Sequence, residues 1–301
     1  MTEVGNKVVV VGAGLMGHGI AHAFASAGHR VTLVDIDAAA LEKAKGKIDE
    51  IIAGGIKLGK VTLEAGEATR AALSTSTALA ASAEGADLLI ETATELLPVK
   101  LDILREVDPA LPAHAIIGTN TSALSVTEIA GACADPARVV GMHFFNPVHK
   151  MKLLELVVGL ATSPETLARA RAYGEAVGKA VIAVNDSPGL TTSRMSAMLG
   201  NEAMWMLSEG VASAEDIDTA LRLGFNHPMG PLELGDLTGW DTRLKVLQYL
   251  HGVLGDKFRP CPLILKMVKA GRIGRKAGAG VYRYDEEGRK IAGSGLKGSY
   301  L

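Results

Sequence analysis

Cysteine and aromatic residues are scarce in this chain, and its charges nearly cancel. The two cysteines, Cys133 and Cys261, lie far apart and form no CxxC motif. This pattern argues against a disulfide scaffold and favours two inert thiols in a reducing compartment. Aromatic residues make up only 4 %, too few for a base-stacking nucleic-acid surface. Lys plus Arg number 31 against 33 Asp plus Glu. The net charge is therefore too small to favour binding to nucleic acid or to a membrane.

Long hydrophobic runs are also missing near the N-terminus. The first residues contain no basic segment, and the apolar run at 8–11 is far too short for a signal peptide or a membrane span. We therefore expect a cytoplasmic protein. Apolar residues make up 48 % of the 301 residues, which is ample for the core of one large domain or two ordinary ones.

The first recognisable pattern is a glycine-rich turn between a strand and a helix. A continuous β-branched run at 7–11 is typical of a buried parallel strand, a helical pattern covers 15–27, and a second strand at 30–34 ends at Asp35. The turn itself consists of Gly12, Ala13, Gly14, Leu15, Met16 and Gly17. A bare GxGxxG is weak evidence, but here the strand, the helix and the acid are all in place.

This context predicts a dinucleotide site. Glycines allow the backbone to approach a pyrophosphate, and the N-terminus of the following helix meets its negative charge. Asp35 would accept a hydrogen bond from the ribose 2′-hydroxyl and would repel a 2′-phosphate. The sequence therefore predicts NAD, rather than NADP, as the cofactor, and no metal.

Residues 38–72 have a helical pattern, interrupted at Gly54-Gly55. A solvated helical hairpin is the favoured interpretation. The alternative is that one or two of its lysines bind phosphates of a substrate. These lysines are Lys43, Lys45, Lys47, Lys57 and Lys60.

Further strands are predicted downstream, and polar residues follow their ends. The strands are expected at 86–93, 114–118, 138–142, 152–158 and 179–184. Ligands bind at the carboxyl ends of strands in an open α/β sheet. Glu91 and Glu95 lie at and beyond one such end, and Thr119-Asn120-Thr121-Ser122 follows another. Ser122 is expected to cap the next helix, to face the ligand, or both.

The strand at 138–142 brings His143 to the same edge, and the strand at 152–158 carries Glu155. Oxidising a secondary alcohol needs a proton acceptor beside the hydroxyl, and histidine suits this because its pKa lies near working pH. A carboxylate on the other ring nitrogen fixes the tautomer. We predict a His143–Glu155 pair, although a lone histidine is more often structural. The other seven histidines are left in that structural role.

Strand signals stop after the break at 185–189. We predict an α/β fold: a Rossmann-type, doubly wound, mainly parallel sheet in domain 1–186, then an all-α domain, 187–301. Its helices are expected at 190–209, 215–223, 232–254 and 262–271. Their apolar surface suggests a homodimer through this half. The polar tail at 285–301 is expected to be frayed.

Several motifs together resemble one family, the 3-hydroxyacyl-CoA dehydrogenases. Within it, the chain is most similar to the bacterial 3-hydroxybutyryl-CoA dehydrogenases. The match runs in order over roughly residues 7 to 284. The motifs are Gly12-x-Gly14-x-x-Gly17, Asn120-Thr121-Ser122, His143-Phe144-Phe145-Asn146-Pro147, Lys152-Leu153-Leu154-Glu155, Asp186-x-Pro188-Gly189, Asp216-Ile217-Asp218, Pro228-Met229-Gly230-Pro231 and Lys276-x-Gly278-x-Gly280.

The resemblance implies reversible, NAD-dependent oxidation of an (S)-3-hydroxyacyl-CoA to the 3-oxoacyl-CoA. It makes His143 the general base and Glu155 its orienting partner. Ser122 would hydrogen-bond the substrate 3-oxygen near the nicotinamide, and Asn146 would help to hold cofactor and substrate. Further cofactor contacts implied by the resemblance are Glu95, Lys100 and Lys276.

The resemblance also places coenzyme A near the helices at 41–60, which points to Lys57. One departure is Ser193 before Arg194, where many relatives carry Asn. Serine cannot mimic the two-sided contact of an amide, so Ser193 is retained as a candidate substrate contact.

Two alternatives stay open at this point. One is a dehydrogenase of a related 3-hydroxy acid, such as 3-hydroxyadipyl-CoA or a CoA-free sugar acid. The other is a non-catalytic NAD-binding protein, since a fold alone does not guarantee function. Acyl chain length and pathway are not determined by the residues.

Overall fold

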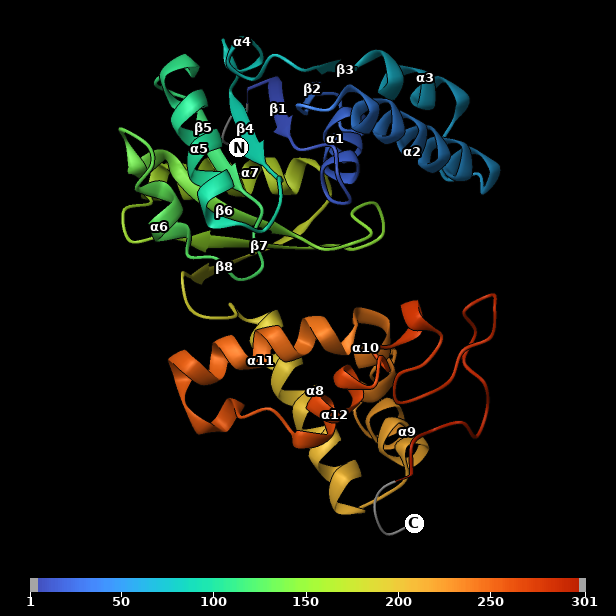
Figure 1. Cartoon of the computed structure of the whole chain (residues 1–301). Coiled ribbons are helices and arrows are strands. Elements are labelled where there is room, and N and C mark those ends of the chain that lie inside the picture. The colour runs from blue at the N-terminus through green and yellow to red at the C-terminus, as the bar shows by residue number, and fades with distance from the viewer. Residues whose placement is uncertain (1–4, 298–301) are drawn as a thin grey trace. The chain divides into compact units, whose positions relative to one another are not determined.

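The computed structural model describes residues 5–297 of the chain. The chain divides into two compact units, Met1–Ser187 and Pro188–Leu301 (Figure 1). The first unit contains one sheet in the order β3-β2-β1-β4-β5-β6-β7-β8. The strands are β1 (Lys7–Val11), β2 (Arg30–Val34), β3 (Leu73–Ser76), β4 (Leu88–Glu91), β5 (Ile116–Thr119), β6 (Val139–Phe144), β7 (Leu153–Val158) and β8 (Ala180–Asn185).

The strand order reverses between β1 and β4, which are neighbours in the sheet although β2 and β3 separate them in sequence. Such a reversal opens a crevice at the carboxyl ends of the two strands. β1 is buried along its length from Val8 to Val11, as expected of a strand covered on both faces. The site described below is built around these strand ends.

Helices cover both faces of the sheet. Ile20, Phe24 and Tyr173 from α1 and α7 join α2 in the core on one face. Leu104 and Ile129 from α5 and α6 join α4 in the core on the other. The helices of this unit are α1 (Gly17–Ser26), α2 (Ala38–Lys57), α3 (Leu63–Ala71), α4 (Leu79–Ala83), α5 (Leu97–Val107), α6 (Val126–Ala130) and α7 (Pro164–Ala176), with 3₁₀ helices η1 (Asp108–Ala110) and η2 (Pro136–Arg138).

β6 and β7 pair in the antiparallel sense, while the other pairings in the sheet are parallel. The register places His143 directly opposite Glu155. Residues opposite one another on an antiparallel pair project to the same face with their Cβ atoms close together. The pairing alone therefore brings the two predicted functional side chains together.

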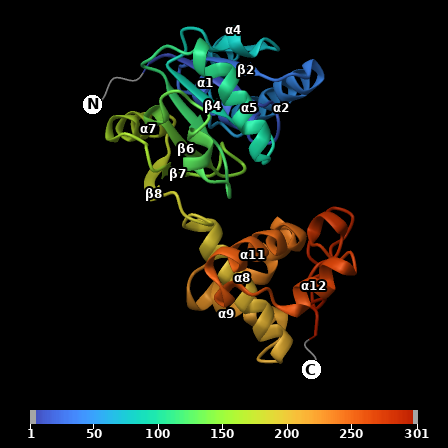
Figure 2. The ribbon, with the colours of Figure 1, turned by 60° about the vertical axis from the view of Figure 1, so that its left-hand side comes forward.

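The second unit is helical (Figure 2), and α8 contacts α9, α10, α11 and α12. Buried Trp240, Phe258 and Tyr282 contribute to its core. Its helices are α8 (Thr192–Glu209), α9 (Ala214–Gly224), α10 (Pro231–Thr238), α11 (Trp240–Leu254) and α12 (Pro262–Lys269), with 3₁₀ helices η3 (Asp256–Phe258) and η4 (Arg275–Ala277). The predicted fold class, a Rossmann-type sheet followed by an all-α part, is confirmed.

Two predicted boundaries are wrong, and one strand was missed. Gly54-Gly55 does not interrupt the first hairpin helix, because α2 continues to Lys57 and the break falls before α3. Strand β3 was not predicted. The helix expected at 232–254 is two helices, since Gly239, at φ +94°, ends α10 and precedes α11.

The expectation of a frayed tail is wrong for residues 285–297. The backbone N–H of Ile291 donates to Arg283 O, and that of Leu296 donates to Val281 O. Gly295 N–H donates to the Glu215 carboxylate at 2.9 Å. Residues 298–301 lie outside the described residues. Within residues 5–297, no helix combines the length and the apolar character that a membrane crossing requires.

Candidate active site

The glycine-rich turn has the backbone geometry that its sequence predicts. Gly12 has φ +101°, a conformation that side chains rarely adopt. A Cβ on Gly17 would lie 1.7 Å from Gly12 O, so only glycine allows the helix to start this close to the strand. A Cβ on Gly14 would meet no atom within 4 Å. Gly14 therefore borders open space at the N-terminus of α1, where a pyrophosphate would fit.

A cavity of about 590 Å³ adjoins this turn. Asp35 lines it, and its carboxylate accepts hydrogen bonds from Ala13 N–H at 2.7 Å and from Asp37 N–H at 3.0 Å. These two donors fix the carboxylate beside the glycines. The remaining lining is largely apolar, as suits an adenine ring. It consists of Val11, Gly12, Gly14, Leu15, Met16, Val34, Ile36, Thr77, Leu79, Thr92, Ala93, Thr94, Val99 and Ile103.

His143 and Glu155 form a buried pair. The His143 Nδ1 lies 2.7 Å from Glu155 Oε2. Glu155 is 0 % exposed and His143 is 7 % exposed. An ionised carboxylate only accepts, so Nδ1 carries the proton and donates it to Glu155. The Nε2 atom then keeps its lone pair, which is the form that a general base needs.

The end of β6 is tied to the loop after β5. Asn120 Oδ1 accepts from the N–H of Phe144 at 2.9 Å. The ring of Phe145 lies with its centroid 4.5 Å from that of His143. Asn146, an exposed residue, comes next in the chain and precedes Pro147. Asn120 has no predicted role of its own, and only its place among polar neighbours marks it in the sequence.

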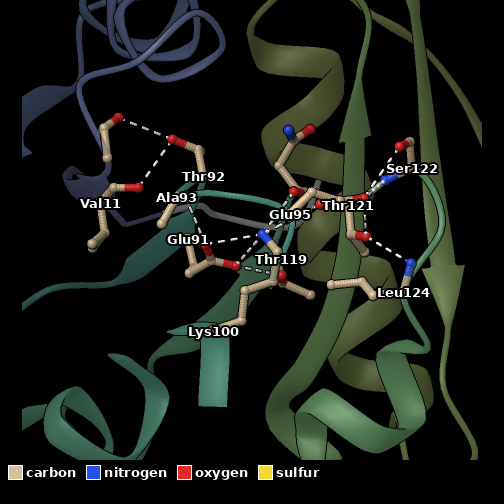
Figure 3. A network of polar contacts seen from close by, with 12 residues as sticks. Val11, Glu91, Thr92, Ala93, Glu95, Lys100, Thr119, Thr121, Ser122 and Leu124 are labelled. Carbon is tan, nitrogen blue, oxygen red and sulfur yellow. Dashed lines mark hydrogen bonds and ion pairs between the residues drawn. The ribbon is translucent and has the colours of Figure 1, made fainter. Parts of the chain in front are cut away.

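Ser122 and Glu95 are also brought together, as Figure 3 shows. The Glu95 carboxylate accepts from Ser122 N–H at 2.8 Å and from the Ser122 hydroxyl at 3.2 Å. It also accepts from the Thr121 hydroxyl at 2.7 Å. Ser122 itself is exposed. Glu95 thus acts as a fixed acceptor under the loop that presents the Ser122 hydroxyl.

Lys100 lies beneath this loop and is fully buried. Its ammonium donates to both oxygens of Glu91, at 3.0 and 2.9 Å. It also donates to Asn120 O at 3.2 Å. The ammonium is therefore enclosed by oxygens of the chain itself. Glu91 was predicted to lie at the strand end but has no predicted role, because burial of a charged pair leaves no sequence pattern.

The three other candidate residues lie in α2, α8 and η4. Lys57 is exposed at the last turn of α2. Ser193 lies in the first turn of α8, and Lys276 donates to Asp241 at 2.8 Å. Ser193 and Lys276 belong to the second unit, whereas Lys57 belongs to the first.

Within the first unit, the strand ends thus hold a histidine oriented by a carboxylate, the exposed residue Ser122 and a cavity suited to a dinucleotide. This combination can remove a proton from an alcohol beside a hydride acceptor. Among residues 5–297, no group of three His, Cys, Asp or Glu side chains is arranged to hold a metal ion.

Comparisons with known proteins agree with this chemistry. Residues 7–187 match the model of the 3-hydroxyacyl-CoA dehydrogenase NAD binding domain, and residues 189–284 match that of the C-terminal domain of the same family. A probable 3-hydroxybutyryl-CoA dehydrogenase of Bacillus subtilis is 43 % identical over 93 % of this chain and 98 % of that protein. The 3-hydroxybutyryl-CoA dehydrogenase of Bradyrhizobium diazoefficiens is 42 % identical over 94 % and 97 %.

A solved structure gives the same result. The (S)-3-hydroxybutyryl-CoA dehydrogenase from Ralstonia eutropha matches with a TM-score of 0.90 and 41 % identity, over 93 % of this chain and 99 % of that one. The enzyme class and the NAD cofactor predicted from the sequence are confirmed. The chain belongs to the 3-hydroxyacyl-CoA dehydrogenase family.

Proposed function

We propose that this protein catalyses the reversible NAD-dependent oxidation of (S)-3-hydroxybutyryl-CoA to the 3-oxoacyl-CoA. The observation that carries the proposal is the 2.7 Å contact between His143 and the buried Glu155. The relatives named above are 3-hydroxybutyryl-CoA dehydrogenases and span nearly the whole chain. A protein that only binds NAD would not need both His143 and Glu155.

In this mechanism, His143 Nε2 accepts the proton of the substrate 3-hydroxyl. Glu155 stabilises the imidazolium that results, because its carboxylate faces the other ring nitrogen. Ser122 donates its hydroxyl proton to the 3-oxygen, and Asn146 holds substrate and cofactor beside it. Bound NAD would supply the hydride acceptor. In the reverse direction His143 returns its proton to the oxygen.

The glycine-rich turn and Asp35 would hold the cofactor. Gly12, Gly14 and Gly17 leave room for the pyrophosphate, and the backbone at Leu15 and Met16 leads into α1, whose N-terminus favours negative charge. Asp35 would accept from the ribose 2′-hydroxyl. Additional cofactor contacts are assigned to residues around the strand ends and in the second unit. These are Glu95, Ser122, Asn146 and Lys276, while Lys100 is fully buried and would act on the cofactor through Glu95.

We assign residues 1–186 as the NAD-binding domain and 187–301 as the domain that closes the cleft and forms a homodimer. Exposed Met195, Leu223 and Phe225 on the helical unit support a partner surface. Ser193 and Lys57 are proposed to contact the acyl-CoA. Sedimentation of the purified protein tests the dimer, and a monomer at micromolar concentration would contradict it.

The test of the reaction is a series of 3-oxoacyl-CoA substrates of rising chain length, assayed in parallel with NADH and NADPH. We expect the highest kcat/KM with acetoacetyl-CoA and NADH. A relative from Escherichia coli, 39 % identical over 95 % of this chain, is a 3-hydroxyadipyl-CoA dehydrogenase, so 3-oxoadipyl-CoA is included. A higher kcat/KM with 3-oxoadipyl-CoA would change the proposed substrate to 3-hydroxyadipyl-CoA. NADH binding without turnover of any substrate would contradict the proposal.

A further inference from the structure

Two buried charges lie under the loop that presents Ser122. Glu91 and Lys100 are both 0 % exposed, and neither has access to water. Glu91 is held by four contacts: two from Lys100, one from the Thr119 hydroxyl at 2.7 Å and one from Ala93 N–H at 2.7 Å. A buried ion pair is costly to desolvate and is often replaceable by apolar residues without loss of stability. Its presence therefore calls for a role besides stability.

The pair is the inner end of a line of alternating charges. Lys100 Nζ lies 2.9 Å from Glu91 and 3.7 Å from Glu95 Oε2. The other oxygen of Glu95 receives the donors of Thr121 and Ser122. Figure 3 shows this sequence of contacts from Glu91 to Ser122. Lys100 lies between two carboxylates, and Glu95 lies between Lys100 and the donors of the loop. A shift of one of these side chains would therefore displace the next.

We infer that Glu91 is a positioning residue for Ser122: it fixes Lys100, and through Lys100 it sets the carboxylate of Glu95 that holds the Ser122 hydroxyl. The inference rests on the proposed function, in which Ser122 contacts the substrate oxygen. Lys100 also donates to Asn120 O, so the same ammonium holds the backbone where the loop that carries Ser122 begins.

Glu95 can hold Ser122 while leaving its hydroxyl free to turn. The backbone N–H of Ser122 donates to Glu95 at 2.8 Å, and the hydroxyl donates to the same oxygen at 3.2 Å. A serine hydroxyl has one proton to donate. When the 3-oxygen of the substrate arrives, the hydroxyl can donate to it, while the shorter backbone bond keeps the residue in place. This exchange requires Glu95 to stay still.

Removal of the Glu91 charge should disturb this arrangement. Lys100 would lose its bidentate acceptor and move onto Glu95, the other carboxylate in its reach. Glu95 would then turn from the Ser122 loop toward the ammonium. Displacements of about 1 Å at positioned groups can cost a hundredfold in rate. The effect should fall mainly on kcat, with a smaller loss of NADH affinity because Glu95 is also a proposed cofactor contact.

The experiment compares Glu91→Gln, Lys100→Met and the double variant with the native chain. In Lys100→Met, Glu91 is left buried without its cation, so this variant should lose the most thermal stability. In the double variant the net charge of Glu91, Lys100 and Glu95 returns to its native value of −1. We expect the double variant to regain thermal stability but to keep a kcat about ten- to a hundredfold below native.

A matched control is Asp108→Asn, which also removes a carboxylate from an ion pair of this unit. Asp108 pairs with Arg138, just before β6, and its side chain is 9 % exposed. This variant should lose stability with native kcat on acetoacetyl-CoA and NADH. A native kcat in Glu91→Gln or in the double variant would overturn the inference.

A crystal structure of Glu91→Gln separates this inference from the proposed function. We expect Glu95 to lie closer to Lys100 and to lose its bond to the Ser122 hydroxyl. Unchanged Glu95–Ser122 contacts would overturn the positioning role, whatever the reaction is. A native chain without dehydrogenase activity would instead refute the proposed function, and the structural comparison would still decide the inference.

Discussion

His143 and Glu155 lie opposite each other on the antiparallel strands β6 and β7, with Nδ1 2.7 Å from Oε2. Both belong to regular strands of a buried sheet, so hydrogen bonds of the backbone fix their separation. A loop would give neither residue this precision. The antiparallel pairing of β6 and β7 therefore contributes directly to the geometry of the site.

Glu155→Gln should retain the fold but lose most of the activity. An amide NH₂ facing Nδ1 favours the tautomer with its proton on Nε2, which cannot act as a base. Loss of a correctly oriented carboxylate costs up to about ten-thousandfold in kcat in comparable pairs. Steady-state kcat with 3-hydroxybutyryl-CoA and NAD, together with Tm, checks this. An active variant would show that Glu155 does not set the tautomer.

Asp35→Ala should weaken NADH binding and narrow the preference over NADPH. The carboxylate is fixed by Ala13 N–H and Asp37 N–H, so its charge points into the cavity. Loss of a charged hydrogen bond to the ribose corresponds to about ten- to a hundredfold in affinity. Fluorescence titrations with both cofactors measure the ratio. An unchanged ratio contradicts the ribose assignment.

Gly14→Ala and Gly17→Ala form a matched pair. A Cβ at Gly17 would overlap Gly12 O, so this variant should lose stability as well as NADH binding. A Cβ at Gly14 meets nothing within 4 Å of the protein. Gly14→Ala should therefore keep the native Tm and lose affinity for NADH only. Native NADH affinity in Gly14→Ala would place the pyrophosphate elsewhere.

His22→Gln should reduce the loss of stability that the protein undergoes between pH 7 and pH 4.5. Burial, together with repulsion from His149, His18 and Lys179, lowers the pKa of His22 to about 4. The unfolded chain binds this proton below about pH 6.5, whereas the folded chain binds it only near pH 4, so stability falls as pH drops through that window. Because the side chain is only partly buried, we expect about 1–2 kcal/mol.

Urea unfolding of both proteins at pH 7 and pH 4.5 measures this effect. His29 and His149 also have lowered pKa values because of burial, so the native chain loses stability from more than one source. The difference between the two proteins isolates His22. An identical pH dependence in both would contradict the lowered pKa of this residue.

Much of the sheet could be predicted from residue patterns, because β1 and β4 are mainly apolar runs and β2 carries Val31, Leu33 and Val34. Strand β3, Leu73–Ser76, could not, since Leu-Ser-Thr-Ser at the edge of the sheet has no such run. The division of α10 from α11 depends on Gly239. A glycine within a helical pattern is often tolerated, and only its positive φ shows that the helix ends there.

The candidate site was predictable where chemistry leaves a local motif, as at the glycine turn. His143 and Glu155 were paired on chemical grounds, but the antiparallel register that joins them is a property of the folded sheet. Glu91 and Lys100 have no motif in common. Their pairing depends on complete burial, which tertiary packing decides and which no spacing along the chain reveals.

The most direct test of the central claim is kcat of His143→Ala, measured with NADH and acetoacetyl-CoA alongside NADH binding. His143 Nε2 is proposed as the group that exchanges the proton, so kcat should fall by at least about a hundredfold. NADH should bind with native affinity, because Asp35 and the glycine turn are untouched. A variant with native kcat would contradict the account and remove His143 from the mechanism.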